Sequence, residues 1–225
     1  MRPERFERIQ RILDRRQPDL TVLMERVNKP YNLSAILRNC DAVGILEVHA
    51  VPPEEGITLH RDTSGGTARW VGLREHPDGP SAIRVLQASG FQVIAADPED
   101  GARDYRDFSY TEPTAFVVGA ELYGIGHESL ALADGRVRIP MTGMVRSLNV
   151  SVATALLLYE AYRQREAAGM YETSRLAPEV RTRLLFEWSY PKMARRLATS
   201  GGSYPELDER GEIVGRAPVT PSDTP

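Results

Sequence analysis

Short apolar runs alternate with helical patterns along most of this chain, and this alternation restricts the fold more than any other feature. The strand candidates are residues 20–27, 47–51, 91–96, 113–118 and 136–139, with a weaker one at 71–74. The helical patterns between and after them are 32–42, 81–88, 127–133 and 149–167. Strands that alternate with helices form βαβ units. The sequence therefore predicts an α/β domain over residues 18–168, with a mostly parallel sheet and flanking helices.

The two ends of the chain have a different pattern. Apolar residues recur at helical spacing within 5–16 and arginines occupy the opposite face, which predicts a basic N-terminal helix in residues 1–17. Residues 178–188 and 191–197 are further helix candidates, in a basic C-terminal extension at 169–198. The Gly, Ser, Pro and charge-rich stretch 199–225 predicts a flexible tail.

Charge is segregated along the chain, although its formal net value is only −3. Residues 1–16 carry six arginines against three acids, 91–134 carry nine acids against two arginines, and 160–200 carry eight cations against five glutamates. Arginine-rich ends suit phosphate contacts, and the same pattern also fits ordinary solvated helix faces. Nucleic acid therefore stays a candidate partner despite the negative total.

Cellular location and cysteine usage follow from composition. No run approaches the roughly 18 apolar residues of a membrane span, and the N-terminus is charged where a signal peptide turns apolar. We therefore expect a cytoplasmic protein with no membrane partner. Cys40 is the single cysteine, so an intramolecular disulfide is excluded and a thiolate metal site is disfavoured. Its apolar neighbours predict a buried, inert thiol, and no metal cluster is expected.

Residues 139–153 are organised like a ligand site, because a strand end breaks into a polar loop before a long helix begins. Ligands of open α/β folds bind at the carboxyl ends of strands, near free backbone amides and helix N-termini. We expect Gly143 to provide a positive φ or a close backbone approach, with Ser147 and Asn149 near the helix start. A simple capped helix after a turn is the alternative.

Two upstream segments have related features. Residues 119–124 place Glu121 between two glycines directly after a strand, which predicts close backbone approach and one aimed carboxylate. Residues 32–38 begin a helix with Asn32 and carry Arg38 nearly two turns later, so both can face one pocket. Residues 63–67 weakly resemble a phosphate-binding nest, and His49 is expected to be a satisfied core or edge histidine.

In this order, the segments 32–38, 119–124 and 139–153 resemble the three signature motifs of the knotted SPOUT RNA methyltransferases. The likeness covers about residues 5–190 and is nearest to the branch that methylates the ribose of guanosine 18 in the tRNA D-loop. It implies a C-terminal trefoil knot, a homodimer with its site near the subunit interface, and S-adenosylmethionine as cofactor. The cofactor positions implied are Ala96, Gly119, Ile139, Met144 and Leu148.

The same resemblance assigns catalytic positions to Asn32, Arg38, Glu121, Ser147 and Asn149. It gives Arg38 the central role. Because a guanidinium is essentially always protonated, we expect Arg38 to grip the phosphate beside the target ribose and to stabilise developing alkoxide charge, rather than to act as a base. The basic positions implied to hold tRNA are Arg8, Arg16, Arg163 and Arg165.

Other functions stay open at this point. Ribosomal RNA is an alternative substrate for the same chemistry, since phosphate contacts do not identify the RNA. A non-catalytic RNA-binding module is an alternative of another class, disfavoured by the intact set of catalytic positions. A nicotinamide-dependent enzyme is disfavoured because the chain lacks the glycine-rich nucleotide fingerprint.

Overall fold

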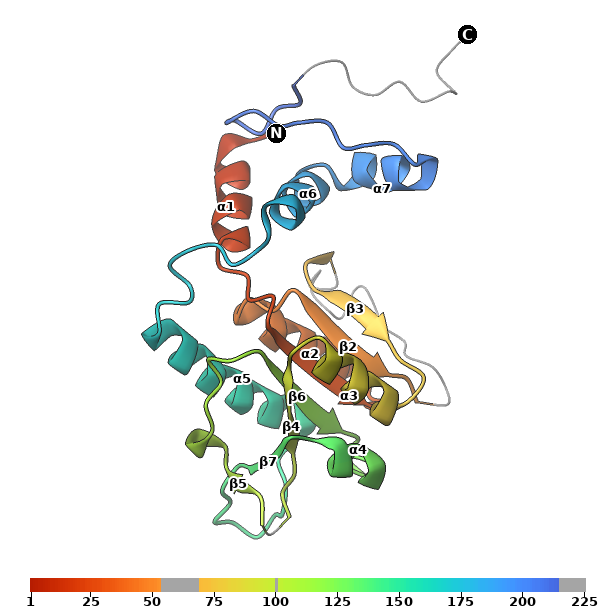
Figure 1. Ribbon diagram of the computed structural model, residues 1–225, viewed down its shortest axis with the longest axis vertical. Helices are drawn as coiled ribbons and strands as arrows, with labels where there is room; N and C mark the ends of the chain where they lie inside the picture. The colour runs from red at the N-terminus through yellow and green to blue at the C-terminus, as the bar shows by residue number, and fades with distance from the viewer. Residues whose placement is uncertain (54–68, 100, 215–225) are drawn as a thin grey trace. The chain divides into compact units, whose positions relative to one another are not determined.

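The computed structural model describes residues 1–53, 69–99 and 101–214 (Figure 1). The chain divides into two compact units. The larger unit is Gln17–Tyr171, and the smaller one combines Met1–Arg16 with Glu172–Pro225. The segment 63–67, with its weak phosphate-nest pattern, lies outside the described residues.

The larger unit is built on a seven-stranded sheet with the order β3-β2-β1-β6-β4-β7-β5, and every described strand pair is parallel. The strands are β1 Leu20–Glu25, β2 Glu47–Val51, β3 Gly72–Glu75, β4 Gln92–Ala96, β5 Arg103–Asp104, β6 Thr114–Gly119 and β7 Gly135–Arg138. This confirms the α/β class and the mostly parallel sheet.

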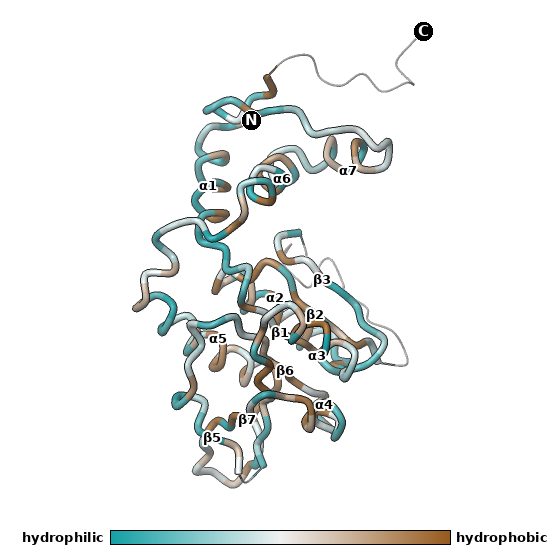
Figure 2. Tube along the Cα trace, viewed as in Figure 1, coloured by the Kyte–Doolittle hydropathy of each residue, from teal (hydrophilic) through white to brown (hydrophobic). Residues whose placement is uncertain are grey.

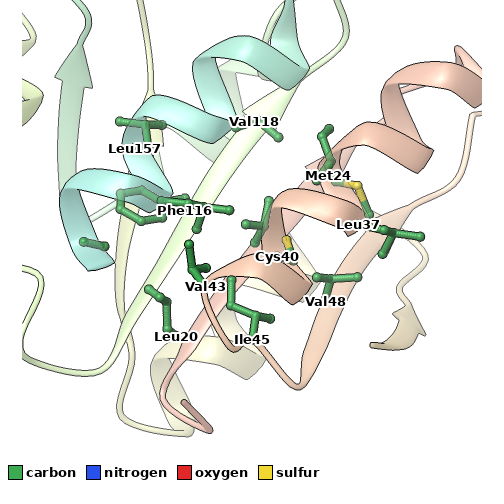
Figure 3. Close-up of a cluster of buried hydrophobic side chains, with 14 of the residues drawn as sticks. Leu20, Met24, Leu37, Cys40, Val43, Ile45, Val48, Phe116, Val118 and Leu157 are labelled. Atoms are coloured by element: carbon green, nitrogen blue, oxygen red, sulfur yellow. The ribbon is translucent and has the colours of Figure 1, made fainter. Parts of the chain in front are cut away.

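Helices cover both faces of this sheet. Helices α2 (Pro30–Ala42) and α5 (Val150–Ala167) pack on one face, where Cys40 and Leu157 meet Phe116 of β6 (Figure 3). Helices α3 (Gly79–Ala88) and α4 (His127–Leu132) pack on the other face, against Val117 and its neighbours. The result is a three-layer arrangement in which the central strands have no solvated face.

The sequence of the central strands explains this burial. All six residues of β1 are buried, and so are the first five of β6, which is brown in the hydropathy view (Figure 2). Successive side chains of a strand point to opposite faces. A strand covered on both faces is therefore apolar throughout instead of alternating, as the runs at 20–27 and 113–118 indicate.

Three features of the larger unit differ from the prediction. Helix α2 begins at Pro30, two residues before the expected start, because proline fits the first turn of a helix. The two-residue strand β5 and the 3₁₀ helix η2 (Tyr105–Asp107) lie in a segment expected to be a loop. Gly143 has no positive φ and no described heavy atom within 4 Å of an added Cβ, so the expected positive φ is wrong and no part of the described chain requires glycine there.

Helix α5 also differs in its orientation. The apolar residues Val152, Ala155, Leu156 and Tyr159 predict a packing face for this helix, but Val152, Leu156 and Tyr159 are 47%, 38% and 53% exposed. The buried residues are Val150, Thr154, Leu157, Leu158, Ala161 and Arg165. The apolar stripe read from the sequence therefore faces away from the core of its own chain.

The described residues of the smaller unit form three helices: α1 Pro3–Leu13, α6 Pro178–Ser189 and α7 Pro191–Ser200. Phe6, Ile9 and Leu13 are the buried stripe of α1, as their helical spacing predicts. The Arg5 guanidinium donates to the Trp188 carbonyl at 3.2 Å, and Arg181 Nε donates to Asp14 Oδ1 at 2.7 Å. These bonds join the first and last parts of the chain within this unit.

Residues 201–214 are packed onto this unit, although composition predicts flexibility from residue 199. Leu207 and Ile213 form an antiparallel bridge and pack with Phe186 and Leu197. Gly211 lies against the ring of Phe6, and its carbonyl accepts a hydrogen bond from the Tyr190 hydroxyl at 2.8 Å. The aliphatic residues and the glycine of this stretch thus make contacts that its mainly polar composition does not predict. Residues 215–225 lie outside the described part.

Two sequence predictions about single side chains are confirmed. Cys40 is buried in the core, and this burial raises the pKa of its thiol, which suits an inert role. His49 is 6% exposed, and its Nδ1 lies 2.8 Å from Nε2 of His76, so it is a satisfied histidine within the sheet. No helix among the described residues is long and apolar enough to cross a membrane.

Candidate active site

The carboxyl ends of β4, β6 and β7 lie side by side in the sheet and open into one cavity of about 670 Å³. Its lining comes from the segments that follow these strands and from the first turns of α5. Four of the five expected cofactor positions line it: Ala96, Gly119, Ile139 and Leu148. The fifth, Met144, lies outside the lining and is 99% exposed. The topology of parallel strands has thus brought together segments that are up to about fifty residues apart.

The turn after β6 forms one wall of this cavity. A Cβ on Gly119 would lie 2.1 Å from the Gly124 carbonyl carbon, so only glycine permits the chain to fold back so closely. Gly124 has a φ of 65°, and its amide donates to the Ala120 carbonyl at 2.8 Å. Both glycines therefore have the backbone roles expected for them, and they direct Glu121 toward neighbouring elements.

Glu121 is the centre of a hydrogen-bond network. Its Oε1 accepts from Asn32 Nδ2 and from Asn149 Nδ2, each at 2.9 Å. Asn149 Nδ2 also donates to Asn32 Oδ1 at 3.1 Å. Three predicted catalytic side chains, from three segments of the chain, are thus in direct contact. Asn32 is 1% exposed, so its amide is fixed by packing as well as by these bonds.

Lys29 is a member of this network that the sequence analysis missed. Its ammonium donates to Glu121 Oε2 and forms an ion pair with it. The hydrogen bond from Lys29, followed by that from Asn32, holds the pKa of the Glu121 carboxyl below its ordinary value, and the same pairing raises the pKa of Lys29. The position of Lys29 directly before Pro30, at the start of the helix that carries Asn32, is the signal that could have identified it.

Asn149 has two roles at once. Its Oδ1 caps helix α5 by accepting from the Ser151 amide at 2.9 Å, while its Nδ2 donates into the network. The capped-helix alternative is therefore confirmed for this residue, and its catalytic assignment stays a prediction. Capping fixes the amide in one orientation, since swapping its oxygen and nitrogen would break both sets of bonds.

Ser147 and Arg38 differ in their placement. Ser147 lines the cavity, as does its neighbour Arg146. Arg38 is exposed on α2 and is not among the residues that line the cavity. The structure of one chain thus gathers four of the five predicted catalytic residues at the cavity or its edge, and Arg38 lies outside the cavity lining.

An ion pair between the buried Asp97 and the half-exposed Arg136 supports the β4 end of the cavity. Asp97 is 5% exposed, and its Oδ2 accepts from Arg136 Nε at 2.7 Å; its Oδ1 accepts from the Glu99 amide at 3.1 Å. These bonds tie the loop after β4 to strand β7. Within the described residues, no group of three or more His, Cys, Asp or Glu side chains is placed to hold a metal ion.

The four arginines expected to hold RNA fall into two classes. Arg8 is exposed on α1, and Arg163 is 66% exposed beside Glu160. Arg16 is 1% exposed and lies over the Trp188 ring, 5.1 Å from its centroid. Arg165 is fully buried. The first pair can reach an RNA phosphate, whereas the second pair has almost no accessible surface in this chain.

The prediction for Arg165 therefore needs correction. Its guanidinium donates to Asp19 Oδ1 at 2.7 Å, to Gln17 Oε1 at 3.1 Å, and to the carbonyls of Asp19, Tyr110 and Glu112 at 2.8–3.0 Å. A guanidinium has five N–H groups, so these five contacts leave none for a phosphate. Arg165 holds together the segments that lead into β1 and β6.

A family model described as the SpoU rRNA Methylase family matches residues 19–159, and a second one, described as SpoU, rRNA methylase, C-terminal, matches residues 163–216. The chain belongs to the SpoU methylase family. The first match covers the whole sheet and the network of Glu121. The second covers the last turns of α5, helices α6 and α7, and the packed segment beyond them.

Individual relatives agree with this membership. A tRNA (guanosine(18)-2'-O)-methyltransferase of Thermus thermophilus is 56% identical over 184 residues, which are 82% of this chain and 95% of the relative. The solved Aquifex aeolicus TrmH/SpoU tRNA modifying enzyme superimposes with a TM-score of 0.79 at 38% identity, covering 84% of this chain and 96% of that one. The SpoU methyltransferase AviRb of Streptomyces viridochromogenes, solved in complex with AdoMet, has a TM-score of 0.60 at 27% identity, covering 68% and 59%.

Proposed function

We propose that this protein transfers a methyl group from S-adenosylmethionine to the ribose 2'-hydroxyl of guanosine 18 in tRNA. The observation that carries the proposal is the contact between Glu121, Asn32 and Asn149 at the edge of the strand-end cavity. The membership in the SpoU methylase family and the name of the Thermus thermophilus relative supply the reaction and the substrate. A tRNA substrate also accords with a reaction in the cytoplasm.

The cavity fits the methyl donor. A volume of about 670 Å³ lies within the usual range for small-molecule sites, roughly 300–1,000 Å³. Val118, Val137 and Ile139 provide an apolar wall for an adenine ring, and the strand-end backbone provides polar groups beside it. Ala96, Gly119 and Leu148 would hold the cofactor there, together with the backbone near Met144. When bound, S-adenosylmethionine supplies an electrophilic methyl group on a sulfonium.

The residues at the cavity edge then have one main task, which is to align the ribose hydroxyl with the methyl group and to favour loss of its proton. The lowered pKa of Glu121 makes this carboxylate a poor general base at neutral pH. We assign it the orientation of the Asn32 and Asn149 amides. Ser147 contacts the donor or the acceptor from the cavity lining. Arg38 grips the adjacent phosphate and stabilises the developing alkoxide.

A methyl-transfer assay tests this function. The protein is incubated with labelled S-adenosylmethionine and an unmodified tRNA transcript, and the 2'-O-methyl nucleotide is mapped. We expect label at guanosine 18 and none on a transcript with adenosine at that position. Label on a ribosomal RNA transcript instead would establish the alternative substrate, and RNA binding without any label would establish a non-catalytic module. The Arg38→Ala variant should keep RNA binding and lose the label.

We also propose that two copies of the chain associate through α2 and α5. These two helices pack against each other and expose Tyr31, Val152, Leu156 and Tyr159, which are 38–60% accessible. A group of exposed aromatic and aliphatic side chains on neighbouring helices is typical of the core of a protein interface. Light scattering should give twice the chain mass for the wild type and a monomer for Tyr159→Arg. Val214→Arg, at a position with the same 53% exposure in the smaller unit, is the control and should stay dimeric.

The trefoil knot is part of this proposal as well. Strand β7 lies between β4 and β5, and the chain then leads from β7 through residues 139–149 into α5 on the α2 face of the sheet. This path, with the family membership, supports a chain threaded through its own loop. A crystal structure traced through residues 91–167 tests it, and an unthreaded trace would refute it.

A further inference from the structure

The ion pair between Lys29 and Glu121 links the start of α2 to the turn after β6. Lys29 is the residue that precedes the first turn of α2, with an extended φ of −82° and ψ of 118°, and its side chain is 46% exposed. Glu121 is 27% exposed by the same measure. Lys29 and Lys192 are the two lysines of the chain, so a compact ammonium beside the cavity stands out among arginines.

The two oxygens of Glu121 have different partners. Oε1 accepts from both amides, Asn32 and Asn149, whereas Oε2 accepts from Lys29. A carboxylate held through one oxygen can rotate about its terminal bond, and that torsion is broad. The bond from Lys29 therefore fixes the plane of the carboxylate, and with it the position of the oxygen that orients both amides.

We propose that Lys29 is a positioning residue for methyl transfer, acting through Glu121 on the amides of Asn32 and Asn149. This inference rests on the proposed function, because its main effect is on the rate of that reaction. Lys29 is a cation that contacts the hydrogen-bond network of Glu121 directly. The competing role for Lys29 is a phosphate contact with RNA, and the two roles differ in which constant changes on substitution.

Lys29→Met is the first variant to measure, because methionine keeps the length of the side chain and removes the ammonium. We expect kcat to fall about tenfold or more, since a misplaced group of about 1 Å can cost up to about a hundredfold. The dissociation constants for S-adenosylmethionine and for tRNA should stay within about twofold of the wild type. Lys29→Arg should recover part of the lost kcat. Lys192→Met is the control and should keep the wild-type kcat.

A double-mutant cycle shows whether Lys29 acts through Glu121. In the Glu121→Gln background, Lys29→Met should lower kcat by no more than about twofold, because its partner is already changed. Equal fold-losses in both backgrounds would overturn the proposal. A weaker tRNA affinity for Lys29→Met, with the slope of log affinity against log salt reduced by about one, would establish the phosphate contact instead.

Hydrogen exchange separates a failure of this inference from a failure of the proposed function. If the wild type methylates no RNA, the function is refuted, but the anchoring role of Lys29 can still be measured. Amides in residues 119–126 should exchange faster in Lys29→Met than in the wild type and the Lys192→Met control. Identical exchange in all three proteins would refute the anchoring role, whatever the methylation assay gives.

Discussion

Two polar clusters lie at opposite ends of the elements β1, β6 and α5. One cluster borders a cavity and the other contains a fully buried arginine. At the carboxyl ends of the strands, Asn149 at the start of α5 meets Glu121 in a network beside an open cavity. At the amino ends, Arg165 near the end of α5 is fully buried and donates to Asp19 and to the segment before β6. The same elements thus hold a site at one end and a structural clamp at the other. Accessibility distinguishes the two.

The largest effect is expected at the buried end. Arg165→Met removes the partner of the Asp19 carboxylate and a donor to the carbonyls of Tyr110, Asp19 and Glu112. Thr114 still donates to the carbonyls of Asp19 and Glu112, whereas Tyr110 loses the donor to its buried carbonyl. Breaking a buried ion pair by removing one member typically costs about 3–5 kcal/mol. We therefore expect the free energy of unfolding, measured with urea, to fall by that amount.

Arg163→Met is the matched control for this measurement, since it lies two residues away on the same helix and is 66% exposed. Its ion pair with Glu160 is a surface i,i+3 pair, for which about 0.5 kcal/mol or less is typical. If both substitutions destabilise the protein equally, the buried clamp assigned to Arg165 is wrong.

The second effect concerns the wall of the cavity. Gly119→Ala would place a Cβ 2.1 Å from the Gly124 carbonyl carbon, and backbone atoms cannot rotate away as a side chain can. The turn that carries Glu121 must shift. We expect the affinity for S-adenosylmethionine, measured by calorimetry, to fall at least about tenfold, or roughly 1.4 kcal/mol.

Gly143→Ala tests whether this loss is specific. Gly143 lies in the loop before α5, and no described atom lies within 4 Å of the Cβ that alanine would add. Its cofactor affinity should stay close to that of the wild type. An equal loss in both variants would mean that any side chain on these loops disturbs the cavity, and the close approach at Gly119 would explain nothing.

Gly119 and Gly143 show which structural features could be predicted from the sequence alone. The fold was predictable because buried parallel strands require continuous apolar runs, and the order of the strands then brings their ends together. The role of Gly119 was visible because a second glycine follows a short distance later in the same turn. Gly143 has no such partner, and the loop around it follows a path that an alanine could also adopt. Only the folded structure distinguishes the two glycines.

Arginine positions were the hardest to interpret, for a physical reason. Arg163 and Arg165 have similar neighbours in the sequence, and α5 turns them about 200° apart on the helix. Whether one is buried depends on acceptors supplied by Gln17, Asp19 and Tyr110, which are far away in the chain. Lys29 precedes a recognisable helix start, but its partner Glu121 lies 92 residues away, so no local pattern pairs the two residues.

The smallest effect is expected for RNA binding by the exposed member of the pair. Arg163→Gln should weaken tRNA binding by about 1 kcal/mol or less and reduce the slope of log affinity against log salt by about one, because a phosphate contact releases a counterion. Arg84→Gln, an exposed arginine on α3 at the other face of the sheet, should leave the slope unchanged. Equal slopes for the wild type and both variants would remove Arg163 from the RNA surface. Helix α5 would then provide no phosphate contact at either of its ends. Arg8 on α1 would be the remaining exposed residue among the four arginines expected to bind RNA.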